Sequence, residues 1–157
     1  MPKRIMVDMS ATLLHHGHIR LLEKAAGLGE VVAALTTDAE IKSAKGYTPE
    51  LSFECRKEIL ESIRYVREVV PSPWLIDETF LDAHNCDVLV HGSDNSNHIP
   101  RERLVIFPRT EGISSSILRG RVLDCLADLN QHCKLVSGRD LNAGLLMETL
   151  KKEFRLE

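Results

Sequence analysis

Short apolar runs rich in β-branched residues alternate with segments of helical periodicity, and this alternation restricts the possible folds more than any other feature. The runs lie at residues 4–9, 30–37, 68–72, 87–92 and 103–108. Strands that alternate with helices over units of about 25 residues form parallel sheets with helices on both faces. We therefore expect an α/β fold, a doubly wound parallel sheet of about five to six strands with helices on both faces.

The helical segments lie between these runs. The helix after residue 15 is predicted to carry a buried face, and Ser52 is a suitable N-cap for a helix over about 53–65. The predicted buried faces consist of Ile19, Leu22, Ala25 and Ala26 in the first helix and of Ile59, Ile63 and Val66 in the second. Further helices are expected at 74–85 and 114–129, a polar loop at 38–52, a sixth strand at 134–138 and a terminal helix at 141–154.

The length of 157 residues fits one domain with one sizeable core. We predict a single domain over 1–157, in which residues 123–157 form a C-terminal helical extension. Trp74 and the methionines of the first strand are most simply core residues.

Composition excludes several classes of protein. The formal net charge is −3 and no basic stretch occurs, so a nucleic-acid partner is not expected. No segment approaches the roughly 20 apolar residues of a membrane span, and the N-terminus lacks the apolar run of a signal peptide. The four cysteines, Cys55, Cys86, Cys125 and Cys133, form no CxxC pair. They predict reduced, mostly buried thiols in a cytoplasmic protein.

Three polar segments follow predicted strands: HHGH at 15–18, HGSDNSNH at 91–98 and RTEGISSS at 109–116. Because the carboxyl ends of parallel strands meet at one edge of a sheet, and ligands bind there, we expect one shared ligand site. Imidazole and carboxylate are also metal donors, so His91, Asp94 and His98 form an alternative metal site. The irregular loop without recognisable ligand spacing argues against it, and we predict no resident metal.

The residue types favour a polyphosphate ligand. Gly17 allows close approach of the backbone at a helix start, where free N–H groups favour an anion, and His15 and His18 lie one helical turn apart. Arg109 supplies a guanidinium, and Ser114–Ser116 supply hydroxyl groups at another helix start. With Lys45 as a further point charge, the set is more suitable for a nucleoside triphosphate than for a monophosphate.

These segments carry a family resemblance. HHGH resembles the HxGH signature of the nucleotidylyltransferase superfamily, and RTEGISSS resembles the RTEGISTT signature of cytidylyltransferases that make CDP-alcohols. Residues 4 to about 122 resemble glycerol-3-phosphate cytidylyltransferases most closely, while residues 7–18 also resemble cytidylyltransferase domains of phosphonate pathways. The resemblance implies a Rossmann-like fold, transfer of CMP from CTP to a small phosphorylated or phosphonate alcohol, Mg²⁺ bound with CTP, and a homodimer that uses residues 64–70.

The resemblance also implies residue roles. His15 and His18 would stabilise the pentacoordinate α-phosphoryl group, and Lys45, or less strongly Lys42, would hold the β- and γ-phosphates. Arg109 would act with them as a catalytic residue. The implied nucleotide-binding residues are Met9, Ser10, Gly17, Asp94, Thr110, Ile113, Ser114, Ser115 and Ser116. The implied acceptor-binding residues are Thr12, Arg56 and Arg64, although a solvated helix face or a dimer contact explains the two arginines equally well. His16, the variable position of the signature, is expected to be exposed.

The chain departs from the family at two places. Thr12 replaces the aspartate of the usual GTFDLLH, and Ser93 and Asn95 replace an acid and an aromatic residue of GDDW. Three functions therefore stay open: a CTP-dependent cytidylyltransferase, which we favour, an ATP-dependent adenylyltransferase, and a nucleotide-binding protein without turnover. Glycerol 3-phosphate, phosphoethanolamine, phosphocholine and small phosphonates all remain possible acceptors.

Overall fold

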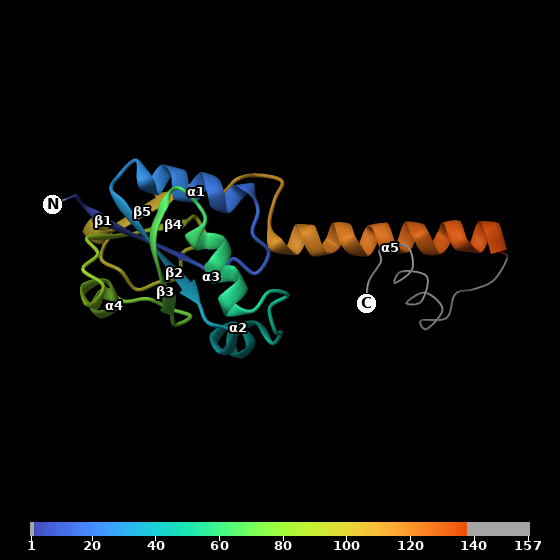
Figure 1. Ribbon diagram of the computed structural model, residues 1–157, viewed down its shortest axis with the longest axis horizontal. Helices are drawn as coiled ribbons and strands as arrows, with labels where there is room; N and C mark the ends of the chain where they lie inside the picture. Colours follow the sequence, from blue (N-terminus) through green and yellow to red (C-terminus); the bar gives the residue numbers. More distant parts are fainter. Residues whose placement is uncertain (1, 138–157) are drawn as a thin grey trace. The chain divides into compact units, whose positions relative to one another are not determined.

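The computed structural model describes residues 2–137. It divides into two compact units, Met1–Ser115 and Ser116–Glu157, and the sheet lies in the first of them. The five strands are β1 (Arg4–Met9), β2 (Glu30–Thr36), β3 (Val66–Ser72), β4 (Val88–Gly92) and β5 (Leu104–Phe107). They are all parallel and lie in the order β3-β2-β1-β4-β5, which confirms the predicted Rossmann-like α/β sheet (Figure 1).

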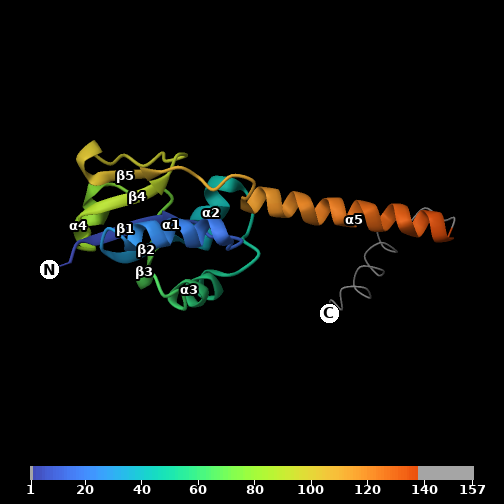
Figure 2. The same cartoon turned by 90° about the horizontal axis from the view of Figure 1, so that it is seen from above.

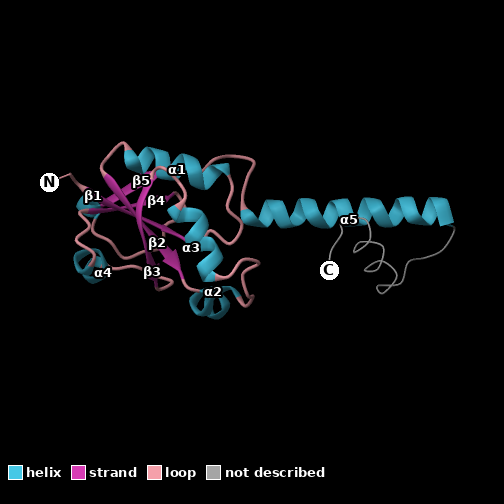
Figure 3. Cartoon of the chain, in the orientation of Figure 1, coloured by secondary structure: helices cyan, strands magenta, loops and turns pink. Residues whose placement is uncertain are grey.

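Helices cover both faces of this sheet (Figures 2 and 3). The helices of the first unit are α1 (His16–Ala26), α2 (Asp38–Lys45), α3 (Phe53–Glu61), α4 (Glu78–Ala83) and the 3-10 turn η1 (Arg101–Arg103). Leu22 of α1 and Leu60 of α3 pack with Val7 on one face, whereas Leu81 of α4 packs with Met6 on the other. Alternate side chains of a central strand thus enter two separate cores, which explains why these strands are apolar throughout.

The polar stretch predicted as a loop is partly helical. α2 occupies Asp38–Lys45, and the Thr37 hydroxyl caps it by accepting a hydrogen bond from the backbone N–H of Glu40 at 3.4 Å. The helix ends at Gly46, whose φ of 77° lies in the left-handed region that favours glycine. The prediction failed because only Ile41 of this short helix is buried, so hydrophobic periodicity gave no signal.

Several predicted boundaries and faces are also wrong. α3 ends at Glu61 and buries Arg56 and Leu60, whereas Ile59 is exposed. α4 is shorter than predicted, and Trp74 is only half-buried. Residues 134–137 belong to a helix and not to a sixth strand, while 141–154 lie outside the described residues.

The long helix α5 (Ser115–Ser137) begins at the boundary between the two units. Its start agrees with the predicted helix at 114–129, and Val122 and Leu123 are among its exposed side chains. Cys125 in this helix and Cys55 in α3 are exposed, contrary to prediction, whereas Cys86 is buried as predicted. None of the described helices is both long enough and apolar enough to span a membrane.

Candidate active site

The three polar segments lie beyond the carboxyl ends of the strands, at the point where the strand order reverses. β1 is flanked by β2 on one side and β4 on the other, so the connections after these strands leave toward opposite sides. Such a switch point is the usual ligand site of an open α/β sheet. The strands that lead to these segments end at Met9, Gly92 and Phe107.

His15 and His18 form a reciprocal cap at the start of α1. His15 is the N-cap residue, and its Nδ1 accepts a hydrogen bond from the backbone N–H of Gly17 at 3.1 Å. The backbone N–H of His15 donates in turn to Nδ1 of His18 at 3.2 Å. Since both Nδ1 atoms are acceptors, each neutral ring carries its proton on Nε2. Both imidazoles are thereby available as Nε2–H donors at a helix N-terminus.

The surroundings of these two rings favour the neutral form. Burial and, to a smaller extent, the neighbouring His15 lower the pKa of His18 to about 4. Burial also lowers the pKa of His15, with smaller contributions from His16 and Arg109. At neutral pH the pair therefore offers hydrogen-bond donors and not positive charges. His16 itself is exposed, as predicted.

The RTEGISSS segment lies against the same helix start. A Cβ atom placed on Gly17 would be 2.9 Å from the His15 ring and 3.4 Å from Cγ2 of Ile113, so only glycine allows this approach. The Ser115 hydroxyl donates to the carbonyl of Leu13 at 3.4 Å. Gly112 makes the turn with a φ of 72°. The first and third polar segments thus come together, as expected from the topology.

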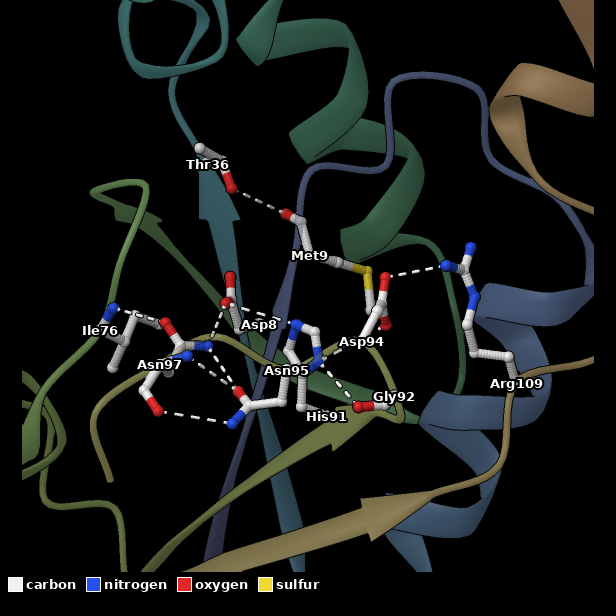
Figure 4. Close-up of polar contacts among 10 residues, drawn as sticks. All are labelled: Asp8, Met9, Thr36, Ile76, His91, Gly92, Asp94, Asn95, Asn97 and Arg109. Carbon is white, nitrogen blue, oxygen red and sulfur yellow. Dashed lines mark hydrogen bonds and ion pairs between the residues drawn. The ribbon is translucent and has the colours of Figure 1, made fainter. Parts of the chain in front are cut away.

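Arg109 connects the third segment to the second. Its Nη1 lies 2.8 Å from Oδ2 of Asp94, and both side chains are about half exposed (Figure 4). A Cβ atom on Gly92 would be 2.8 Å from Oδ1 of Asp94 and 3.3 Å from Cγ of Arg109. Glycine at the end of β4 therefore leaves the space that this ion pair occupies.

Asp8, near the end of β1, is a site residue that sequence reasoning missed. It is 8% exposed, and its Oδ2 accepts a hydrogen bond from Nδ2 of Asn97 at 2.8 Å (Figure 4). His91 lies between two carboxylates, with Nε2 3.7 Å from Asp8 and Nδ1 3.9 Å from Asp94. Burial raises the pKa of the Asp8 carboxyl, while the Asn97 hydrogen bond and His91 oppose that rise. The sequence feature that could have indicated this residue is an aspartate within an otherwise apolar strand.

The described residues contain no group of three or more His, Cys, Asp or Glu side chains that could hold a metal ion. His91 and Asp94 are close together, but His98 is exposed and its backbone pairs with Asp77 in an isolated bridge. The alternative three-ligand metal site is therefore not formed.

The two arginines of the α3 region have different surroundings. Arg56 is 1% exposed and forms an ion pair of 2.6 Å with Asp38, so a solvated helix face is the wrong interpretation for this residue. Arg64 is exposed, and its guanidinium lies 4.9 Å from the ring centroid of Tyr65. Roles of Arg64 in acceptor binding or in a dimer stay predictions.

The remaining predicted residues lie in several segments of the chain. Lys45 lies in the last turn of α2, with Nζ 5.2 Å from the ring centroid of Trp74. Thr12 is buried, and the carbonyl of Met9 accepts a hydrogen bond from the Thr36 hydroxyl. Ser10, Thr110 and Ser114 are half-buried, Lys42 is exposed, and Ser116 belongs to the second unit. Their roles toward a nucleotide stay predictions.

Residues 12–121 match a family model described as cytidylyltransferase-like. The chain belongs to the cytidylyltransferase-like family. The match covers most of the first compact unit and includes both HHGH and RTEGISSS. It confirms the resemblance that these two segments carry.

Individual relatives of this cytidylyltransferase-like chain are similar over different shares of their length. The glycerol-3-phosphate cytidylyltransferase of Bacillus subtilis is 39% identical over 76% of this chain and 97% of that protein. The corresponding protein of Staphylococcus aureus is 36% identical over 74% of this chain and 92% of that protein. An ethanolamine-phosphate cytidylyltransferase of Dictyostelium discoideum is 34% identical over 87% of this chain, which spans only 40% of that protein.

A solved structure agrees on the fold. The lipopolysaccharide core biosynthesis protein of Thermoplasma volcanium superposes with a TM-score of 0.55 over 80% of this chain and 89% of that one, at 17% identity. The relatives named above are cytidylyltransferases, which are nucleotidyltransferases. The cytidylyltransferase-like chain is accordingly an enzyme of the nucleotidyltransferase class, as predicted.

Proposed function

We propose that this protein transfers CMP from CTP to a small phosphorylated or phosphonate alcohol and releases pyrophosphate. An oxygen of the acceptor's phosphate or phosphonate group attacks the α-phosphorus of CTP. The bond between that phosphorus and the oxygen bridging to the β-phosphate breaks, and pyrophosphate leaves with the bonding electrons. The observation that carries the proposal is the pair of neutral imidazoles at the start of α1, where Gly17 lies close to Ile113 of the segment that resembles RTEGISTT.

In this reaction His15 and His18 donate their Nε2–H groups to the oxygens of the pentacoordinate α-phosphoryl group. Donors fixed in place before the reaction stabilise developing charge without reorganisation, and the positive end of the α1 dipole acts in the same direction. Arg109 exchanges its present partner Asp94 for the nucleotide. Lys45 leaves the Trp74 ring to hold the β- and γ-phosphates.

Mg²⁺ is the proposed counter-ion of the triphosphate. The described residues build no cluster of ligands for it, which fits an ion held mainly by phosphate oxygens with at most one or two carboxylates. Asp94, a half-exposed carboxylate at the end of β4, is the side chain placed to assist. When bound, the ion neutralises charge on the triphosphate.

We propose an acceptor other than glycerol 3-phosphate, with a small phosphonate as the leading candidate. Thr12 is buried where the family usually has aspartate, so the acceptor's anionic group meets no repulsion there. The carboxylate of Asp8 lies at the same edge of the sheet and favours an acceptor that also carries an amino group. Phosphoethanolamine and 2-aminoethylphosphonate both combine these features, and the likeness of residues 7–18 to domains of phosphonate pathways favours the phosphonate.

Release of pyrophosphate tests the proposal. CTP and Mg²⁺ are supplied with glycerol 3-phosphate, phosphoethanolamine, phosphocholine, 2-hydroxyethylphosphonate or 2-aminoethylphosphonate, and ATP replaces CTP in a parallel series. We expect turnover with CTP only, with the highest kcat/KM for a phosphonate. Turnover with ATP alone would indicate an adenylyltransferase, and CTP binding without turnover on any acceptor would indicate a binding protein. A highest kcat/KM for glycerol 3-phosphate would overturn the choice of acceptor alone.

A further inference from the structure

We propose that Arg56 is a positioning residue whose buried guanidinium fixes the segment leading into His15 and His18 together with the start of α2. The inference deepens the proposed function and rests on it, because it concerns how the donors of that reaction are held. Arg56 lies on α3 with its side chain fully buried, so it acts through the elements that it contacts.

The contacts of Arg56 reach four segments of the chain. Its Nε donates to the carbonyl of Leu51 at 3.2 Å, and Nη1 donates to the carbonyl of Ser10. Nη2 donates to the carbonyl of Thr36 at 3.0 Å and to Oδ1 of Asp38 at 2.6 Å. These partners follow β1, end β2, begin α2 and precede α3. One side chain therefore connects the backbone of three segments and the Asp38 carboxylate of a fourth.

Burial makes these contacts obligatory. The side chain of Arg56 is 0% exposed, and its guanidinium lies 5.8 Å from the Phe53 ring centroid. A buried charge without hydrogen-bonded partners is strongly unfavourable, so the carbonyl groups cannot move away from the guanidinium at low cost. A guanidinium directs several N–H groups in a fixed plane, whereas an ammonium group offers a single nitrogen and cannot reach partners this widely separated.

The segment that Arg56 holds leads directly to the histidines. Ser10 precedes Ala11, a non-glycine residue with a φ of 44°, a conformation that persists only where its surroundings impose it. Thr12 follows and is buried, and the carbonyl of Leu13 accepts the Ser115 hydrogen bond. Arg56 thus fixes one end of the segment 10–15, and the His15 cap fixes the other.

The same guanidinium also fixes α2. Asp38 begins this helix, and its second oxygen accepts a hydrogen bond from the backbone N–H of Phe53 at 3.0 Å. The starts of α2 and α3 are thereby joined through one carboxylate. Since Lys42 and Lys45 lie in the last turn of α2, their position depends on Arg56 as well.

Arg56→Lys tests the proposal, and Leu60→Ala, at an equally buried position, is its control. Leu60→Ala removes a fully buried side chain from the same face of α3, one turn further on, and leaves the hydrogen bonds of Arg56 to the four segments in place. Because small misplacements of catalytic groups cost as much as about 10²-fold in rate, we expect kcat of Arg56→Lys to fall at least tenfold, with KM for CTP changed less than about threefold. Leu60→Ala is expected to unfold at lower urea concentration but to keep kcat within about twofold.

A measurement independent of turnover separates this proposal from the proposed function. The ring resonances of His15 and His18 are expected to shift in Arg56→Lys and to stay unchanged in Leu60→Ala. If Arg56→Lys does not fold, Asp38→Asn, which removes the partner charge but keeps an acceptor oxygen, is expected to give smaller shifts of the same resonances. Unchanged ring resonances in a folded Arg56→Lys, or equal shifts in Leu60→Ala, would overturn the positioning role. Wild-type protein without turnover would overturn the proposed function and leave this comparison valid.

Discussion

Two parts of the candidate site meet at the ion pair between Asp94 and Arg109 and differ in their chemistry. The donor part, consisting of His15, His18 and Arg109, presents hydrogen-bond donors at a helix start and suits an anion. The acidic part, consisting of Asp8, His91 and Asp94, brings two carboxylates to one imidazole and suits a cation. A single sheet edge can therefore recognise both an activated phosphate and an acceptor of mixed charge.

The largest expected effect is the loss of a donor. His18→Ala should lower kcat by about 10²- to 10³-fold with little change in KM for CTP, because an aimed donor acts mainly in the transition state. His15→Ala should behave similarly, and His16→Ala is the matched control and should be nearly silent. Steady-state kinetics of the three variants tests this. A loss in His16→Ala as large as that in His18→Ala would contradict the assignment of the donor part.

Gly17→Ala should disturb the donor part without removing a functional group. The new Cβ would lie 2.9 Å from the His15 ring, so the ring must move, and a displaced donor should lower kcat about tenfold or more. Gly27→Ala, at the opposite end of α1, is the control, because its Cβ would meet only the carbonyl of Lys24 at 3.3 Å. Equal kcat in the two variants would show that the position of the His15 ring does not affect catalysis.

Asp8→Asn should affect the acidic part alone. Removing the charge while keeping the shape should lower kcat/KM for 2-aminoethylphosphonate by roughly tenfold and leave that for 2-hydroxyethylphosphonate within about twofold. The ratio of the two values measures the effect of the amino group directly. A parallel loss on both acceptors would mean that Asp8 serves the fold and not the choice of acceptor.

The sequence predicted the five strands of the sheet well, added a sixth that does not form at 134–137, and predicted several helices poorly. β1 was predicted residue for residue, because an apolar run with both faces buried has few alternatives. Asp8 was missed for the same reason, since one carboxylate within such a run gives no indication of its partners, His91 on β4 and Asn97 in the loop after it. HHGH and RTEGISSS could be recognised because each is a continuous segment.

Arg56 shows a second limit. Sequence periodicity assigns a charged residue of an amphipathic helix to the solvent side, and Arg56 and Arg64 therefore looked alike. Their difference arises from three carbonyl groups of other segments and from Asp38, none of which a helical pattern reports. α2 was missed because it buries only one residue and so shows no hydrophobic periodicity. Its two ends are defined by capping residues instead.

The pH dependence of the free energy of unfolding should also reflect the neutral state of His18. Folding lowers the pKa of His18 from 6.5 to about 4, so the unfolded chain binds more protons between these values. Stability should therefore decrease as the pH falls from about 6.5 toward 4. The raised pKa of Asp8 acts in the opposite sense. Urea unfolding of the wild type and of His18→Gln across this range isolates the histidine, and an identical pH dependence would contradict its lowered pKa.

Nitrogen NMR of the histidine rings shows directly whether the two donors are neutral. In the free protein at pH 7 we expect His15 and His18 both to be neutral, with unprotonated Nδ1 and protonated Nε2. Addition of CTP with Mg²⁺ should shift the Nε2–H resonances of both rings and leave that of His16 unchanged. An imidazolium form of His18 at pH 7, or Nε2–H resonances that do not respond to CTP, would contradict a site built on neutral donors at the start of α1.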